Sequence, residues 1–191
     1  IRFEIRAGEV LGFAGLVGAG RSEIAEALFG LRHTIAGRVE IDGAPFRARS
    51  PQAALARGLV LVSEDRRRDQ AFLGRPLREN VTAPLLRRLA GIAGFQSASQ
   101  ERRLVDALLR RHAVSRPGRE APMASLSGGN QQKVIIGRWI EAEPRICILD
   151  EPTKGVDIGA RGLIHRLVAD LARRGVAILL ISSDLPELLA L

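Results

Sequence analysis

The sequence predicts an α/β fold with an inserted helical subdomain, and three observations support this prediction. Residues 145–149 and 176–181 form apolar runs that do not alternate with polar residues, as is typical of parallel strands covered on both faces. A glycine-rich loop, 15–20, separates an apolar run from a helical pattern. From 72 to about 124, apolar residues recur at helical spacing without a convincing strand between them. A mainly parallel sheet with helices, carrying a helical insertion, accounts for this order.

In the first part of the chain, apolar runs and turn residues delimit five elements. Ile24, Ala25 and Leu28 lie on one side of a helix, and Asp42-Gly43 is a hairpin turn that adds a small antiparallel β portion near the N-terminus. The expected elements are a strand at 9–14, a helix at 22–29, a strand at 38–41, a short helix at 53–57 and a buried strand at 58–62.

The later part predicts the domain organisation. Residues 72–124, interrupted by prolines, form the helical subdomain, whereas 1–71 and 125–191 form the core of one domain. Residues 1–4 have the pattern of a mid-strand segment, and the chain stops within an expected helix, so we expect a piece of a longer polypeptide. The expected core elements after the insertion are a helix from Gly129, strands at 145–149 and 176–181, and helices at 159–174 and 185–191.

The composition limits the class of protein. A chain of 191 residues can bury a proper core, and its single cysteine, without a secretory signal, favours the cytoplasm. The longest apolar runs are too short to cross a bilayer. The net charge of +8 is carried by scattered arginines, with no tyrosine and one tryptophan to stack on bases. We interpret this charge as a coding bias toward arginine and expect no nucleic-acid partner.

The run Gly15-Leu16-Val17-Gly18-Ala19-Gly20-Arg21-Ser22 has the spacing of a phosphate-binding loop, G-x-x-x-x-G-K-[ST], between a strand and a helix. Its glycines allow backbone N–H groups to surround phosphate oxygens, and Ser22 is placed to bind Mg²⁺. Arg21 stands where lysine is expected, and its planar fork needs more room. Glu23, in the first helical turn, either repels a triphosphate or simply caps the helix dipole. We therefore expect weaker nucleotide binding than in a loop with lysine.

Two further motifs follow. The run Leu126-Ser127-Gly128-Gly129-Asn130-Gln131-Gln132-Lys133 is a Ser/Gly turn at the start of a helix, where unobstructed N–H groups and the dipole favour an anion. The strand at 146–150 ends in Asp150 and Glu151, a carboxylate pair suited to a hydrated metal and a water-activating base.

In this order, the motifs resemble the phosphate loop, signature turn and Walker B strand of ATP-binding-cassette (ABC) ATPases, and the resemblance covers nearly the whole chain. Arg21, the run Ser63-Glu64-Asp65-Arg66, the signature run and Ser182-Ser183-Asp184-Leu185-Pro186-Glu187 together resemble the second, C-terminal cassette of ribose/galactose/xylose-type sugar importer ATPases. The resemblance implies a P-loop NTPase core of the ABC type that binds ATP and Mg²⁺ and couples ATP hydrolysis to monosaccharide import.

The resemblance also implies residue roles. Asp150 would hold Mg²⁺ through water, and Glu151 would polarise the attacking water. Glu64 stands where the family has a glutamine that touches Mg²⁺ and the water, and Ser183 where it has a histidine that contacts the γ-phosphate. These departures, with Arg21, predict a degenerate site and an isolated cassette that is weakly active or inactive. The residues expected to contact the γ-phosphate bound on a partner cassette are Ser127, Gly128, Gly129 and Gln131.

The implied partners are a second ABC cassette in head-to-tail packing, expected in the N-terminal half of the same polypeptide, membrane-spanning permease subunits and, indirectly, a sugar-binding protein. This places the protein at the cytoplasmic face of the cell membrane. The segment Gly155-Val156-Asp157 matches a loop that crosses to the partner cassette, or a plain helix cap by Asp157. His33, His112 and His165 are interpreted as ordinary surface or helix residues. The alternative function is a soluble ABC ATPase acting on nucleic acid or ribosomes.

Overall fold

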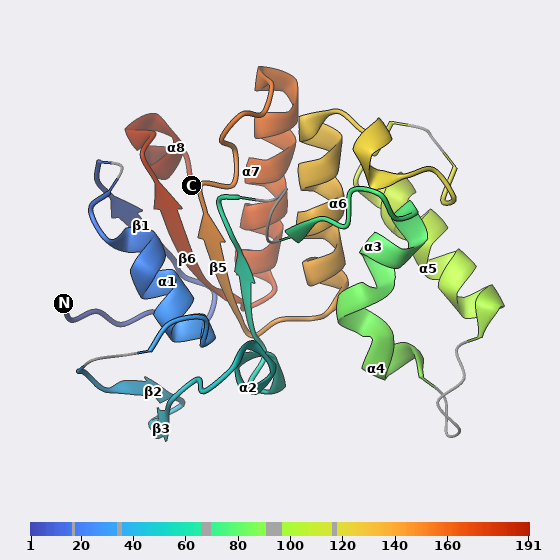
Figure 1. The fold of residues 1–191 in the computed structure, drawn as a ribbon. Helices are drawn as coiled ribbons and strands as arrows, with labels where there is room; N and C mark the ends of the chain where they lie inside the picture. Colours follow the sequence, from blue (N-terminus) through green and yellow to red (C-terminus); the bar gives the residue numbers. More distant parts are fainter. Residues whose placement is uncertain (17, 34–35, 66–69, 91–96, 116–117) are drawn as a thin grey trace. The chain divides into compact units, whose positions relative to one another are not determined.

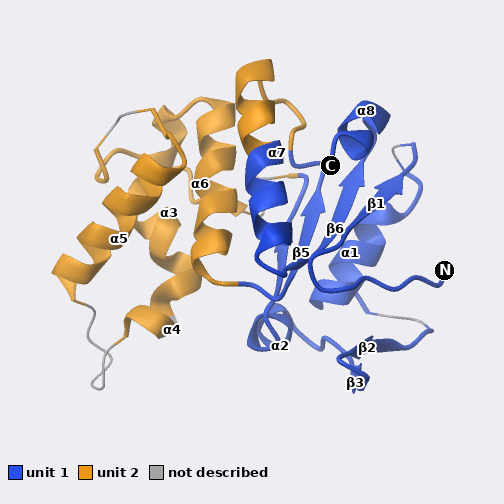
Figure 2. Ribbon diagram, turned by 180° about the vertical axis from the view of Figure 1, so that it is seen from behind, with its two compact units in different colours: residues 1–64, 144–152, 165–191 blue, residues 65–143, 153–164 orange. Residues whose placement is uncertain are grey.

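The computed structural model describes the chain as two compact units (Figure 2). Unit 1 comprises residues 1–64, 144–152 and 165–191, and unit 2 comprises residues 65–143 and 153–164. The described residues are 1–16, 18–33, 36–65, 70–90, 97–115 and 118–191.

Unit 1 is built on a four-stranded parallel sheet (Figure 1). The strands are β1 (Val10–Ala14), β4 (Leu59–Val62), β5 (Ile146–Asp150) and β6 (Ala177–Ser182), in the order β1-β6-β5-β4. In register, Ala14 pairs with Ser182, and Asp150 pairs with Ile181. Because parallel strands end at the same edge, the residues that follow β1, β5 and β6 lie close together, and ligands bind at such an edge.

Successive residues of each strand face opposite sides of the sheet. One face packs against α1 (Arg21–Phe29) and α2 (Pro51–Ala56). On the other face, α8 (Leu185–Leu189) lies so close to β1 that a Cβ at Gly12 would be 3.2 Å from Leu188. Both faces are therefore covered, which explains why the strands do not alternate in polarity. The buried core on the α1 and α2 side comprises Ala25, Phe29, Ala54, Leu59, Leu61, Ile148, Leu179 and Ile181.

The predicted antiparallel portion is present as β2 (Val39–Ile41) and β3 (Ala44–Phe46), which pair across the turn at Asp42-Gly43. The expectation of a mid-strand segment at 1–4 is wrong. These residues form no strand, and Ile1 is 94% exposed. Phe3 instead packs edge-to-face on Phe13, with ring centroids 4.9 Å apart, so the aromatic contact takes the place of strand pairing.

Unit 2 is helical, with an isolated bridge between Pro76 and Pro122. Its buried Arg138 donates to the carbonyl oxygens of Asn80 and Gln70, and burial lowers its pKa to about 10. These bonds join a helix to the segments that precede it. The helical segments are α3 (Leu77–Thr82), η2 (Ala83–Leu85), α4 (Leu86–Leu89), α5 (Ala98–Arg111), η3 (Met123–Ser125), α6 (Gly128–Glu141) and the start of α7 (Ile158–Arg173).

The predicted helical subdomain, 72–124, falls wholly within unit 2, but unit 2 also takes in α6 and the first residues of α7. The interpretation of His112 as an ordinary surface or helix residue is incomplete, because its side chain is 1% exposed. It follows α5 and packs against Gly137, where an added Cβ would lie 2.5 Å from His112 Cδ2. This glycine allows the histidine to be buried.

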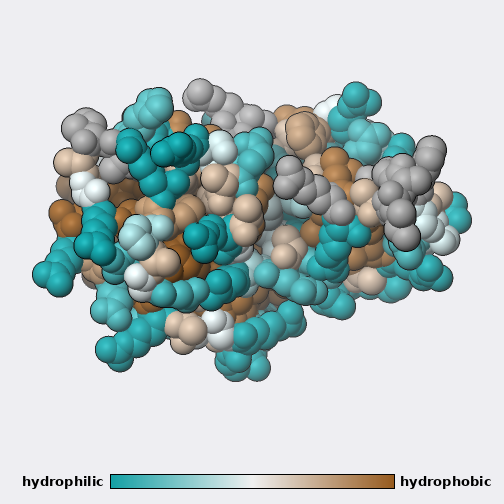
Figure 3. All heavy atoms as spheres, turned by 90° about the horizontal axis from the view of Figure 1, so that it is seen from below, coloured by the Kyte–Doolittle hydropathy of each residue, from teal (hydrophilic) through white to brown (hydrophobic). Residues whose placement is uncertain are grey.

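The surface is mixed in polarity. Figure 3 shows one face on which hydrophilic residues surround smaller hydrophobic areas. Within the described residues, no helix is both long and apolar enough to serve as a membrane span.

Candidate nucleotide-binding site

The glycine-rich loop lies between β1 and α1, as its spacing predicts. Gly18 and Gly20 have φ angles of 86° and 80°, the left-handed region that glycine adopts at little cost. A Cβ at either position would meet no other atom within 4 Å, so the backbone angle and not crowding requires glycine. α1 has no side-chain cap at its N-terminus, so its first N–H groups and its dipole remain directed at the loop. Such a loop suits an anion.

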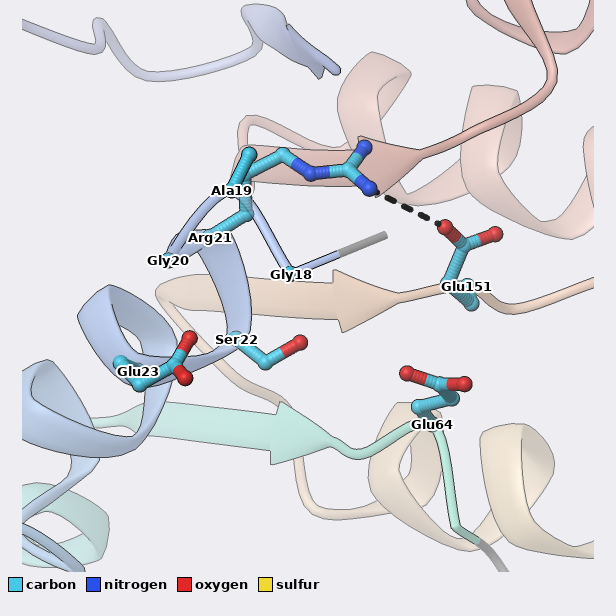
Figure 4. A pocket seen from close by; sticks show the side chains of 8 residues that line it. All are labelled: Gly18, Ala19, Gly20, Arg21, Ser22, Glu23, Glu64 and Glu151. Atoms are coloured by element: carbon cyan, nitrogen blue, oxygen red, sulfur yellow. Dashed lines mark ion pairs between the residues drawn. The ribbon is translucent and has the colours of Figure 1, made fainter. Parts of the chain in front are cut away.

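A pocket opens in front of this loop (Figure 4). It lies within unit 1 and brings together the loop, the start of α1, the end of β5 and the residue that follows Ser63. In the figure, the hydroxyl of Ser22 points toward Glu64 and Glu151, whereas Glu23 lies on the α1 side. The predicted phosphate-loop residues from Gly18 to Ser22 and both glutamates that follow strands therefore share one pocket, whereas Gly15 is not part of its lining. The residues that line it are Gly18, Ala19, Gly20, Arg21, Ser22, Glu23, Glu64 and Glu151.

Arg21 lines this pocket, but its guanidinium is already engaged in hydrogen bonds. Its guanidinium donates to the carbonyl oxygen of Ser182 at 2.7 Å and to that of Leu16 at 3.2 Å. Nη2 also lies 3.7 Å from Oε1 of Glu151, and the Arg21 side chain is 10% exposed. The guanidinium is thus held by the loop itself and by residues at the ends of β5 and β6, and it would have to release these contacts to bind a phosphate.

Asp150, the last residue of β5, is 4% exposed. Its pKa is raised to about 6, chiefly by burial, while a hydrogen bond from Ser22 lowers it and the charge of Glu64 raises it. Within the described part of the chain, Oδ1 of Asp150 has no hydrogen-bond partner. A buried carboxylate oxygen without a partner is costly unless a ligand or cation completes its shell.

Glu151 is held in an unusual conformation. Its φ angle is 49°, which is uncommon for a residue other than glycine and costs on the order of 1 kcal/mol or more. Its N–H donates to the Ile181 carbonyl at 2.9 Å, and its Oε1 accepts from the Ser183 N–H at 2.7 Å. Ser183, one of the predicted site residues, thus contacts the candidate base through its backbone.

The signature turn lies in unit 2. Ser127 is the N-cap of α6, and its Oγ accepts from the backbone and side-chain N–H groups of Asn130 at 3.4 Å and 3.1 Å. These bonds use the acceptor side of the hydroxyl, so its proton remains able to donate. Gly128 is only partly buried and lies at the start of the helix.

Gly129 and Gln131 of the signature run are buried and do not lie on the surface of the turn. Gln131 is 3% exposed, and its amide donates to the carbonyls of Met123 and Leu126. Its contact with a γ-phosphate on a partner cassette stays a prediction. Gly129 is buried, and a Cβ there would lie 3.0 Å from both Ala160 Cβ and Asp157 Oδ2. Close packing therefore explains the second glycine of the motif.

Asp157 caps α7, because its Oδ1 accepts from the N–H of Ala160 at 2.9 Å. The helix-cap interpretation of Gly155-Val156-Asp157 is therefore confirmed, and the crossing to a partner cassette stays a prediction.

Sequence reasoning missed three polar residues behind the pocket. Ser182 and Glu187 are 1% and 4% exposed and hydrogen-bond each other, and His165 contacts Glu187. The only indication in the sequence was that Glu187 is the last residue of the run 182–187, to which no role was assigned.

Known proteins agree with this geometry. Residues 1–154 match the family model described as ABC transporter. Over its full length the chain is 48% identical to a putative ribose/galactose/methyl galactoside import ATP-binding protein of Burkholderia cenocepacia and 47% identical to a ribose import ATP-binding protein of Geobacillus kaustophilus. It spans 36% and 38% of the length of these relatives.

Solved structures of an ABC cassette have the same fold. The dimeric structure of MJ0796, a bacterial ABC transporter cassette, aligns with a TM-score of 0.82 at 22% identity, covering 98% of this chain and 80% of that one. A dimeric post-hydrolysis state of the same cassette, bound to ADP and Pi, aligns with a TM-score of 0.81 at 22% identity, covering 97% of this chain and 79% of that one. With its glycine-rich loop, strand-end carboxylates and Ser/Gly turn, the chain belongs to the ABC transporter family as an ATP-binding cassette.

Proposed function

We propose that this chain is the second cassette of an ATPase that energises monosaccharide import across the cytoplasmic membrane. The placement of the Ser22 hydroxyl beside the buried carboxylate of Asp150, at the mouth of the phosphate loop, carries the proposal. This is the arrangement that phosphoryl transfer needs for a nucleotide and its metal. The names of the relatives supply the substrate class, a pentose or hexose.

The residues present fit Mg²⁺. The Ser22 hydroxyl and the Asp150 carboxylate are hard oxygen donors, and Oδ1 of Asp150 has no partner among the described residues. Within the described residues, no three His, Cys, Asp or Glu side chains form a metal cluster, so nucleotide phosphates and water would complete the shell. Ser22, Asp150 and Glu64 would hold the ion, which would neutralise charge on the phosphate oxygens when bound.

Glu151 is the candidate general base. Its strained backbone and the 2.7 Å bond from Ser183 hold the carboxylate at the pocket, where it would orient and deprotonate a water. The ion pair with Arg21 works against this, because the guanidinium competes with a water for the same carboxylate oxygen. We therefore propose that this cassette's own site binds nucleotide weakly and turns it over slowly.

The signature turn would act on the nucleotide bound by a second cassette. Ser127 keeps its hydroxyl proton, and Gly128 leaves the start of α6 unobstructed. In a head-to-tail pair, these groups would complete the site built on the partner cassette's phosphate loop, which we place in the N-terminal half of the same polypeptide. Asp157 would reach the same interface. Permease subunits would span the membrane and receive sugar from a binding protein, with the cassette at the cytoplasmic face.

Sugar uptake in cells tests this function. A strain lacking the gene is complemented with the full-length wild type or with the Glu151→Gln and Ser127→Ala variants, and uptake of radiolabelled ribose and galactose is measured. We expect the wild type to restore uptake of at least one of these sugars and Ser127→Ala to lower it strongly. Equal uptake with and without the gene, for both sugars, would refute the proposal.

A further inference from the structure

A group of buried polar side chains lies behind the pocket, between β6, α7 and α8. Glu187 is 4% exposed, and its Oε2 accepts from the hydroxyl of Ser182 at 2.6 Å. Its Oε1 lies 3.2 Å from Nε2 of His165. Ser182 in turn accepts from the N–H of Asp184 at 3.0 Å. A carboxylate is seldom buried unless it is paired or hydrogen-bonded, as Glu187 is here.

What these bonds hold is the turn 182–184. Its first residue is tied to α8 through the Glu187 carboxylate, and its last N–H is tied to the same Ser182 hydroxyl. His165, from α7, fixes the carboxylate from the other side. The turn is thus fastened to two helices by one acidic side chain, and a short charge-assisted bond such as that from Ser182 is among the stronger kinds.

The same turn contacts both charged residues of the pocket. The Ser182 carbonyl accepts from Arg21 Nη1 at 2.7 Å, and the Ser183 N–H donates to Glu151 Oε1 at 2.7 Å. Of the bonds that hold the guanidinium, the one to Ser182 is the shortest, since those to Leu16 and Phe13 measure 3.2 Å and 3.5 Å. The position of the turn therefore sets the position of Arg21.

We propose that Glu187 is a positioning residue that holds the Arg21 guanidinium on the Ser182 carbonyl, and so keeps it from binding a phosphate, by fixing that carbonyl. The proposal rests on the proposed nucleotide binding at this loop. For Arg21 to bind a phosphate, its Nη atoms must leave Ser182, Leu16 and Glu151. A rigid turn keeps the guanidinium where it is, and a loosened turn lets it reach the nucleotide.

This role predicts that removing Glu187 tightens nucleotide binding at this site. In Glu187→Ala the Ser182 hydroxyl loses its bond to α8. The end of β6 still pairs with Ala14 but is held less firmly, so breaking the bond of the Ser182 carbonyl to Arg21 costs less. Glu187→Gln retains an oxygen that accepts from the Ser182 hydroxyl, so the Arg21 guanidinium stays bonded to the Ser182 carbonyl. Ser182→Ala removes the same bond from its other end without changing the backbone carbonyl, and it should act in the same direction as Glu187→Ala.

The experiment uses the full-length protein, photolabelled with Mg·8-azido-ATP over a range of concentrations. Labelled peptides from this cassette are quantified by mass spectrometry, which yields the dissociation constant of its own site, separate from that of the partner cassette. The variants are Glu187→Ala, Glu187→Gln and Ser182→Ala, each with Arg21 present and with Arg21→Ala. Glu40→Ala is the matched control, because Glu40 is a surface carboxylate of the same unit whose side chain is 41% exposed. Melting curves check that each variant is folded.

We expect Glu187→Ala and Ser182→Ala to lower the dissociation constant about threefold or more, and Glu187→Gln and Glu40→Ala to leave it unchanged. With Arg21→Ala the effect of Glu187→Ala should vanish, because residues coupled through one interaction are non-additive. The inference would be overturned if folded Glu187→Ala showed an unchanged dissociation constant or weaker binding. It would also be overturned if Glu187→Ala caused the same fold-change when Arg21 is replaced by alanine. A wild type that takes no label in this chain would instead refute nucleotide binding, and the inference with it.

Discussion

Nη2 of Arg21 lies 3.7 Å from Oε1 of Glu151, so the altered residue of the phosphate loop pairs with the candidate base of the same site. Both side chains are largely buried, with 10% and 7% exposure, and solvent screens the pair little. The pair links the departure at Arg21 to the candidate base, because the arginine that stands in place of lysine also restrains the carboxylate. An incoming γ-phosphate would compete with Glu151 for the guanidinium.

The first prediction concerns turnover. The cassette purified on its own should hydrolyse ATP far below about 1 s⁻¹, an ordinary rate for phosphoryl transfer. The resemblance implies that Arg21, Glu64 and Ser183 replace direct contacts to the reacting phosphate or its water, and losing one such contact costs on the order of 100-fold in rate. Release of phosphate, followed at saturating Mg·ATP, measures this. Turnover near 1 s⁻¹ would mean that the site is not degenerate.

The second prediction concerns Asp150. Burial raises its pKa to about 6, which means that the folded state disfavours the charged carboxylate. Asp150→Asn removes this cost, and we expect it to raise the free energy of unfolding at pH 7 by about 1 kcal/mol. The melting temperature should rise by about 2–4 °C without nucleotide, while the further rise caused by Mg·ATP in the wild type should be lost. Calorimetric melting curves with and without Mg·ATP measure both effects.

The control for this variant is Asp170→Asn, because Asp170 is a surface residue of the same unit, 42% exposed and paired with Arg173. It should leave both the melting temperature and the response to Mg·ATP unchanged. A fall in stability for Asp150→Asn would show that the carboxylate is stabilising without a ligand.

The third prediction tests the packing of unit 2. Gly137→Ala places a methyl group 2.5 Å from His112 Cδ2, in a buried site where the ring cannot easily move. Overpacking of this kind costs about 1–3 kcal/mol. Gly118→Ala is the control, since a Cβ there meets no atom within 4 Å. Urea unfolding of the two variants should show a loss only for Gly137→Ala, and equal stabilities would contradict the packing described.

The motifs were predictable because each is local. The phosphate loop, the signature turn and the Asp150-Glu151 pair are short runs whose spacing alone indicates strand–loop–helix or strand-end geometry, and the structure has these elements. The contact of Arg21 with Ser182 joins residues far apart in the sequence, so no local pattern indicates it. The inward direction of Gln131 could not be predicted either, because helical spacing does not tell which polar residue supports a turn and which faces a ligand.

The prediction failed at residues 1–4, which have a strand-like pattern but form no strand. Phe3 packs on Phe13 instead. Glu187 was overlooked for a related reason. An acidic residue near the start of a helix is usually a solvated, dipole-stabilising charge. Only the fold shows it buried between His165 and Ser182.

The last prediction concerns the partner cassette. In the full-length protein, Gly128→Asp should abolish most ATPase activity and sugar uptake, whereas Arg21→Ala should be much milder. Gly128 opens α6, and an acidic residue in the first turn suits the helix dipole, so the fold should tolerate the change. A carboxylate at this position would instead repel the γ-phosphate held by the other cassette. Gly128→Asn, of equal size but uncharged, separates repulsion from steric blocking. If Arg21→Ala proved as damaging as Gly128→Asp, both sites would have to be treated as catalytic.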